Sequence, residues 1–182
     1  MKTKKYLLLS INVWIIAATL SHSIKKKQKG NERPPNIIFI LADDLGYNQV
    51  GYHNPSIITP HIDELAKTGV TLEQNYMQQL CSPSRSSLMT GMYPYHIGRQ
   101  QEVIHPTTPT GLTLNRTLLP ETLKTFGYDT HLVGKWDLGH CNEAYLPMSR
   151  GFDTHFGYWE TFEGYWTKVV SKRFSNASKI SL

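Results

Sequence analysis

The chain has 182 residues, enough for one domain with a buried core and short for two. Its formal net charge of +5 is concentrated at one end, because residues 1–33 hold eight Lys or Arg and one acid. Residues 34–182 hold 11 basic and 13 acidic residues, a net charge of −2, so the body lacks the basic surface that phosphate contacts require and we expect no nucleic-acid partner.

Residues 1–23 have the pattern of a secretory signal peptide. Three early lysines precede a mostly apolar run at 6–20, and the small residues Ser21 and Ser23 offer a cleavage site. The run is short for a membrane span, which needs ~20 apolar residues, so we expect no stable span. A retained anchor is the alternative, because the basic linker at 24–34 follows directly.

The remaining residues, 35–182, read as an α/β domain. The run 37–41 is continuously apolar, which is typical of a strand buried on both faces of a parallel sheet. Thr59 and Pro60 predict the start of a helix that stops at Gly69. The further expected elements are a strand at 70–76, a helix at 83–90, a helix from 120 that stops at 127, and a strand at 130–133. Strands alternating with helices predict a mainly parallel sheet flanked by helices.

Two acids, Asp43 and Asp44, follow the first predicted strand directly. In open α/β sheets ligands bind beyond the carboxyl ends of strands, and adjacent carboxylates are hard oxygen ligands suited to calcium or magnesium. A solvated turn is the alternative, because acids are common at strand ends.

The stretch "CSPSR" surrounds Cys81, one of only two cysteines. It is either a loop leading into a helix that Ser82 or Ser84 caps, or the site of a reactive thiol. A helix N-terminus favours a thiolate, and Arg85 one turn further along would add to that effect. Cys141 is the only disulfide partner that the chain offers, and two cysteines carry no framework signature.

Two further patterns concern charge and modification. Lys135 and Asp137 in "VGKWDLG" point to the same face if the predicted strand continues, although taken alone they indicate a surface ion pair. The sequons "NRT" at Asn115 and "NAS" at Asn176 predict N-glycosylation in a secreted chain.

Four blocks in order resemble the sulfatase family, most closely the arylsulfatase B group. They are "PNIIFILADDLGYNQVGYHNP", "CSPSRSSLMTG", "GYDTHLVGKWDLG" and "RGFDTHFG", and they span residues 35–157. The resemblance implies the N-terminal part of an alkaline phosphatase-like fold, which is a mainly parallel sheet flanked by helices and here incomplete. It implies a sulfuric ester hydrolase that is lysosomal or secreted, with a glycosaminoglycan N-acetylgalactosamine sulfate as the expected substrate.

The same resemblance implies roles for single residues. In the family, the cysteine matching Cys81 is oxidised to Cα-formylglycine by the formylglycine-generating enzyme, and its hydrated aldehyde attacks the sulfur of the ester. By analogy, Asp43, Asp44 and the modified Cys81 bind calcium. Arg85 orients the formylglycine, and Lys135 contacts both the diol and the sulfate.

The chain departs from the family at two points. Asp137 stands where the family has histidine in "GKWHLG"; aspartate accepts a proton but repels sulfate, and His140 is a possible substitute. The later part of the family's catalytic domain, which supplies another metal pair, a lysine and a histidine, has no counterpart here. We expect a truncated copy of a sulfatase, with an inactive product that binds sulfated glycans or the formylglycine-generating enzyme as the alternative. A phosphomonoesterase is disfavoured, because such relatives use Ser or Thr with two metals.

Overall fold

The computed structural model describes residues 34–161, 164, 166–167, 169–170 and 180–181. The chain divides into two compact units, residues 1–77 and residues 78–182, and each has its own description below. The predicted signal peptide and nearly all of the basic linker lie outside the described residues. Across the part that is described, no helix is both long and apolar enough to cross a membrane.

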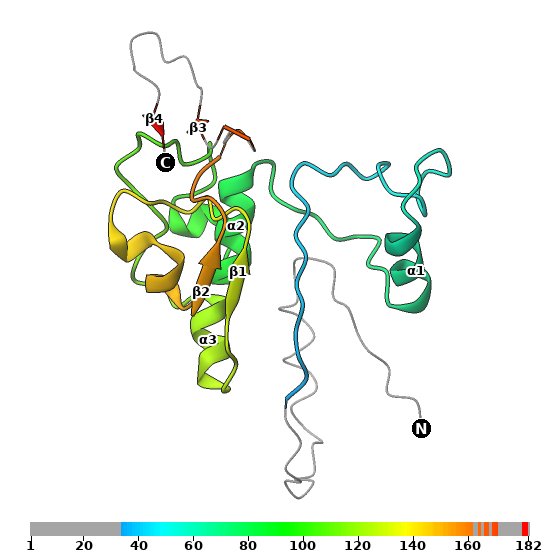
Figure 1. Ribbon diagram of the computed structural model, residues 1–182, viewed down its shortest axis with the longest axis horizontal. Coiled ribbons are helices and arrows are strands. Elements are labelled where there is room, and N and C mark those ends of the chain that lie inside the picture. The colour runs from blue at the N-terminus through cyan, green and yellow to red at the C-terminus, as the bar shows by residue number, and fades with distance from the viewer. Residues whose placement is uncertain (1–33, 162–163, 165, 168, 171–179, 182) are drawn as a thin grey trace, which may run out of the picture. The chain divides into compact units, whose positions relative to one another are not determined.

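In the first unit, helix α1 spans Pro60–Thr68 (Figure 1). Its start is held by Thr59, whose hydroxyl accepts the N–H of Gly51 at 2.6 Å and donates to Oδ1 of Asp63 at 2.8 Å. The helix ends at Gly69. The predicted start and stop are therefore confirmed, although Thr59 acts through Asp63 and not by capping a helix N–H directly.

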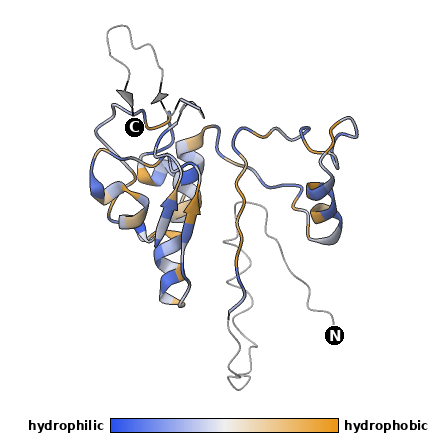
Figure 2. Cartoon of the chain, in the orientation of Figure 1, coloured by the Kyte–Doolittle hydropathy of each residue, from blue (hydrophilic) through white to orange (hydrophobic). Residues whose placement is uncertain are grey.

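The two predicted strands of the first unit are wrong. Residues 37–41 and 70–76 have no strand pairing in this structure. The side chains of Ile38 and Ile40 are 70% and 59% exposed, and Figure 2 shows the first run as a hydrophobic stretch of extended chain. A strand exists only through hydrogen bonds to a neighbour. The described residues of this unit contain no second strand to supply them.

The second unit is a small α/β structure. Helices α2 (Cys81–Thr90) and α3 (Leu119–Thr125) accompany parallel strands β1 (His131–Val133) and β2 (Thr154–Phe156), as Figure 1 shows. His131 pairs with Thr154 and Val133 with Phe156. Short 3-10 helices occupy Pro94–Ile97, Glu143–Tyr145 and Pro147–Arg150, and β3 (Val169–Val170) pairs antiparallel with β4 (Ile180–Ser181). The predicted helices and the strand at 130–133 are confirmed.

The core of the second unit fixes the segment that follows β1. It is built from four fully buried side chains: Leu112, Leu118, Trp136 and Leu138. The Trp136 ring meets Phe152 edge-on at 6.1 Å, and its Nε1–H donates to the carbonyl of Tyr145 at 2.9 Å. Because successive side chains of an extended segment alternate in direction, burying Trp136 in the core directs Lys135 to the opposite side.

Candidate active site

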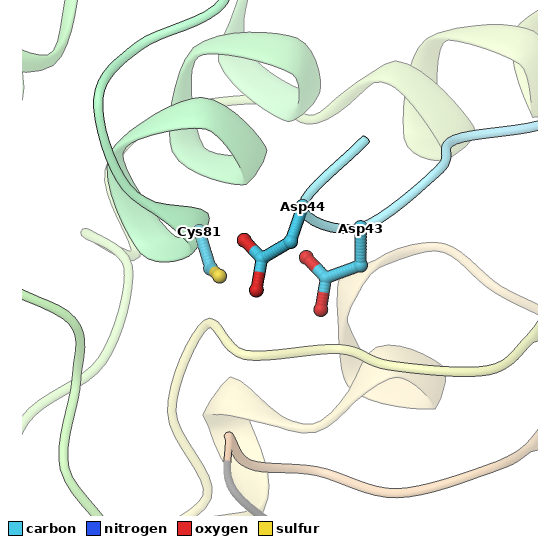
Figure 3. Close-up of side chains that lie close together, drawn as sticks. All are labelled: Asp43, Asp44 and Cys81. Atoms are coloured by element: carbon cyan, nitrogen blue, oxygen red, sulfur yellow. The ribbon is translucent and has the colours of Figure 1, made fainter. Parts of the chain in front are cut away.

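Cys81 is the first residue of α2, two positions earlier than the predicted helix start. Its side chain is half-buried, in the turn whose N–H groups and dipole favour negative charge (Figure 3). Ser82 and Ser84 do not cap the helix. The hydroxyl of Ser82 accepts the N–H of Ile104 at 2.8 Å, and that of Ser84 donates to the carbonyl of Gln78 at 3.2 Å. Both serines therefore anchor this turn to neighbouring chain.

Arg85 connects the two most specific sequence motifs. It lies four residues after Cys81 on α2, is only 9% exposed, and donates from Nη1 to the carbonyl oxygen of Lys135 at 2.5 Å. This bond joins positions 50 residues apart in the chain. A guanidinium used in this way fixes the start of α2 against the segment after β1, which places residue 81 relative to Lys135.

Lys135 and Asp137 are buried, so their interpretation as a surface ion pair is wrong. Backbone pairing continues past β1: the N–H of Gly134 donates at 2.9 Å to the carbonyl of Phe156, the last residue of β2, and those of Trp136 and Asp137 donate at 2.9 Å to carbonyls of the chain after β2. The side chains are 5% and 0% exposed, and Lys135 Nζ lies 3.7 Å from Asp137 Oδ2. Lys135 Nζ also donates to the Thr161 hydroxyl at 3.3 Å.

A second pair of titratable side chains, the partly buried His140 and the buried Glu160, lies beside Lys135 and Asp137. Glu160 is fully buried, and its Oε1 contacts Nδ1 of His140, whose ring stacks on Trp159. Burial, and then the carboxylate of Asp137, raise the pKa of Glu160 to about 8, while Lys135 lowers it. Burial lowers the pKa of His140. At neutral pH Glu160 is therefore mostly protonated and His140 neutral, and the pair adds no net charge beside Lys135 and Asp137.

Sequence reasoning missed Glu160 and Thr161. Both are buried beside the predicted site residues, yet "YWETF" matches no motif. The one available signal was their position, because they follow the "RGFDTHFG" block in the chain that continues β2.

Asp43 and Asp44 belong to the first unit and are both exposed. They follow the extended apolar run, and Asp44 has a φ of 57°. A turn comes directly after them, closed by the N–H of Gly46 on Oε1 of Gln49 at 2.7 Å. Figure 3 shows the two carboxylates on consecutive residues of this loop. They offer adjacent hard oxygen donors, the chemistry that calcium prefers.

The remaining predicted site residues are the second cysteine and the two asparagines of the sequons. Cys81 and Cys141 form no disulfide, and the Cys141 side chain is exposed. Asn115 is exposed within a turn before α3. Asn176 lies outside the described residues.

Comparison with known proteins shows which family this sequence resembles. A family model described as "Sulfatase" matches residues 35–178. Mouse "Arylsulfatase J" is 52% identical over 68% of this chain and 21% of its own length, and human "Arylsulfatase A" is 43% identical over 69% and 25%. Human "N-acetylgalactosamine-6-sulfatase" is 40% identical over 70% and 26%.

A solved structure agrees with these relatives. "Crystal structure of Ps i-CgsB" superimposes with a TM-score of 0.66 at 39% identity, over 70% of this chain and 29% of that one. The chain thus spans between a fifth and three tenths of the length of these proteins. Because the family match covers well over half of its residues, the chain belongs to the sulfatase family.

Proposed function

We propose that this chain carries the nucleophile-bearing part of a sulfuric ester hydrolase site. The observation that carries the proposal is the bond from Arg85 to the carbonyl of Lys135, 2.5 Å long. It brings the helix that begins at Cys81 together with a buried lysine, which is the pairing of a nucleophile and a cation that transfer of an anionic group requires.

Residue 81 acts as nucleophile after oxidation to formylglycine by the formylglycine-generating enzyme. Pro83 and Arg85 support this, because they complete the C-x-P-x-R pattern on which the modification depends in the family. Pro83 is fully buried in the first turn of α2, where a missing N–H costs nothing. Once hydrated, the aldehyde supplies a hydroxyl that attacks sulfur while the bond from sulfur to the ester oxygen breaks and the alcohol leaves. The second hydroxyl then loses its proton, the aldehyde re-forms and sulfate is expelled.

The metal in this proposal is calcium, held by Asp43, Asp44 and the modified residue 81. The donor set fits: the two carboxylates are exposed hard ligands, and oxidation replaces a soft thiol by oxygen. Bound calcium would make that hydroxyl more acidic.

The other site residues orient the nucleophile or bind the substrate. Arg85 holds the first turn of α2 in place, and Lys135 contacts the sulfate group. Asp137 is placed to accept the proton when the aldehyde re-forms, but it does so slowly, because the ammonium of Lys135, 3.7 Å away, stabilises the ionised carboxylate. His140 is the alternative acceptor of this proton, and Glu160 is the residue that contacts its Nδ1.

The substrate class in this proposal is a sulfate ester of a saccharide, with an N-acetylgalactosamine sulfate of a glycosaminoglycan as the expected example. Support comes from the relative named N-acetylgalactosamine-6-sulfatase and from a further structure titled "Crystal structure of Ps i-CgsB in complex with k-i-k-neocarrahexaose". Action in the secretory pathway, with secretion or delivery to the lysosome, follows from the predicted signal peptide.

The test is chemical analysis of residue 81. The full chain is expressed in a eukaryotic secretory system, and the tryptic peptide of residues 68–85 is examined by mass spectrometry and with a hydrazide probe for aldehydes. Formylglycine at residue 81 is expected, with Cys141 remaining a thiol as the internal control. Arg85→Ala should reduce conversion. Thiol alone at residue 81, in cells that convert a co-expressed sulfatase, would refute the proposal.

A further inference from the structure

An open hollow of about 640 Å³ lies in the second unit, away from the residues of the proposed site. The residues that line it include Arg99, Thr113, Leu114, Asn115 and Tyr145. It combines a guanidinium, an aromatic ring and an exposed apolar side chain, since Leu114 is 51% exposed. Saccharides fit such a surface, because their C–H faces pack on aromatic and apolar groups while their hydroxyls accept hydrogen bonds.

The wall of the hollow is held in place by its own contacts. Arg99 donates from Nη2 to the Thr110 hydroxyl at 2.6 Å and also to the carbonyl of Gly111. Its Nε and Nη1 donors have no protein partner within the described ranges. The Tyr145 ring lies directly against Gly111, where any added side chain would overlap it. Donors and ring are therefore pre-positioned for a ligand.

Asn115 places an acceptor for glycosylation on the rim of this hollow. Residues 115–117 form the sequon "NRT" and are all exposed. Oδ1 of Asn115 accepts the Thr113 hydroxyl at 2.7 Å, which orients the amide and leaves Nδ2 for a covalent bond. A bulky glycan can be accommodated here without disturbing the core.

We propose that Asn115 carries an N-linked glycan whose first sugars occupy this hollow. The donor is an oligosaccharide linked to a lipid diphosphate. Nδ2 of Asn115 forms a bond to C1 of the first N-acetylglucosamine, the bond from C1 to the diphosphate oxygen breaks, and the amide loses one proton as the lipid diphosphate leaves. Arg99 then donates to sugar hydroxyls and Tyr145 packs against a sugar face. The inference is independent of sulfatase activity.

Occupancy is tested by glycopeptide mass spectrometry on the full chain recovered from the secretory pathway. Thr117→Ser keeps the sequon and should keep the glycan, whereas Thr117→Ala and Asn115→Gln should lose it. Asn176→Gln removes the other sequon and should leave the Asn115 glycan unchanged. An unmodified Asn115 in chain from cells that glycosylate a reporter protein would overturn the proposal, whatever the state of residue 81.

The position of the sugars is tested by hydrogen exchange. Backbone amides at 97–99 and 110–115 should exchange more slowly in the glycosylated Thr117→Ser chain than in Thr117→Ala. The protection should persist when an endoglycosidase leaves a single N-acetylglucosamine on Asn115. Arg99→Lys, which keeps the charge but not the guanidinium geometry, should reduce the protection without changing occupancy. Identical exchange with and without the glycan would show that the sugars do not occupy the hollow.

Discussion

Asp137 is the residue for which the family pattern predicts a histidine, and its surroundings show what the difference would change. It is fully buried and lies 3.7 Å from the ammonium of Lys135. Its φ of 57° lies in the left-handed region, which Asp, Asn and His enter more readily than most residues. The backbone therefore accepts histidine at this position, and the substitution chiefly changes charge and proton transfer.

Replacing Asp137 by histidine should accelerate turnover. The test joins residues 24–157 of this chain to the C-terminal part of a related active sulfatase and measures aryl sulfate hydrolysis. Because a well-placed general base contributes ~10²–10⁴ in rate, we expect at least about tenfold faster turnover for Asp137→His. The Asp137 form should give one fast turnover and then stall.

Asp137→Asn is the matched control, since it keeps the shape and the backbone preference but accepts no proton. It should gain nothing in steady-state turnover. Equal steady-state rates in folded Asp137 and Asp137→His proteins would contradict the prediction, and would mean that Asp137 or His140 is already as effective a base as histidine at position 137.

Glu160 should make the stability of the second unit depend on pH. Its pKa is raised from 4.5 to about 8, so the native state holds a proton that the unfolded chain releases. The resulting stability is complete below about pH 4.5 and is lost as the pH rises through 8. From pH 6.5 to 8.5 the free energy of unfolding should fall by at most ~1.4 kcal/mol per pH unit.

The comparison is with Glu160→Gln, whose neutral amide does not titrate. Urea unfolding, followed by tryptophan fluorescence, should show a smaller decrease with pH in the variant. The range above pH 6.5 avoids the opposite contribution of His140, whose lowered pKa affects stability only below that value. Parallel pH profiles for the two proteins would contradict the assignment of a buried, protonated Glu160.

At the scale of elements, the pairing of β1 and β2 depends on contacts just before both strands. Each strand has only three residues. Thr130 donates from its N–H to Oδ2 of Asp153 at 2.8 Å and from its hydroxyl to the carbonyl of Gly151 at 2.6 Å. The Lys124 ammonium, 2.6 Å away, and then the Thr130 N–H lower the pKa of Asp153 to about 2. These bonds set the register, and a shift by one residue would turn every strand side chain to the other face.

Thr130→Val should therefore destabilise the second unit. Thr130 is 5% exposed, and its hydroxyl also reaches Asp153 at 3.1 Å, so the variant leaves acceptors without their donor. We expect a loss of about 1–3 kcal/mol in the free energy of unfolding, measured by urea titration. Thr154→Val makes the same change at an exposed site on β2 and should cost less than about 0.5 kcal/mol. Equal effects of the two substitutions would show that Thr130 does not set the register.

At the scale of the whole molecule, both units expose large apolar side chains. The most exposed include Ile38, Ile58, Phe126, Val133 and Phe156, all at 70% or more. Val133 and Phe156 are partners in the β1–β2 register, so one end of that sheet exposes a pair of apolar side chains. Exposed large apolar side chains in such numbers favour association.

We therefore expect residues 24–182 to self-associate. The double variant Ile38→Lys/Ile40→Lys should shift sedimentation toward monomer, because it places two charges on the exposed run. Asn48→Lys/Ser56→Lys adds the same charge at exposed polar sites and should have a smaller effect. A monodisperse wild-type monomer with a sharp thermal transition would contradict this expectation.

Local signals in the sequence were enough to predict the helices. Proline near the first position and glycine just past the end marked α1, α2 and α3, and these signals act within one or two turns of chain. The spacing of Cys81 and Arg85 likewise predicted that they lie one turn apart on the same helix, and both lie on α2.

Tertiary structure decided the features that depend on distant partners. The apolar runs 37–41 and 70–76 have strand composition but no strand, because a strand requires hydrogen bonds from another segment. Lys135 and Asp137 are buried because the chain that follows β2, about 20 to 26 residues later, packs beside them: the N–H of Asp137 donates to the carbonyl of Trp159, and Lys135 donates to the hydroxyl of Thr161. Glu160 matches no motif, and its pKa is raised by burial and by the carboxylate of Asp137, 23 residues earlier in the chain. Composition and spacing describe neighbours along the chain, whereas burial and charge pairing depend on neighbours in space.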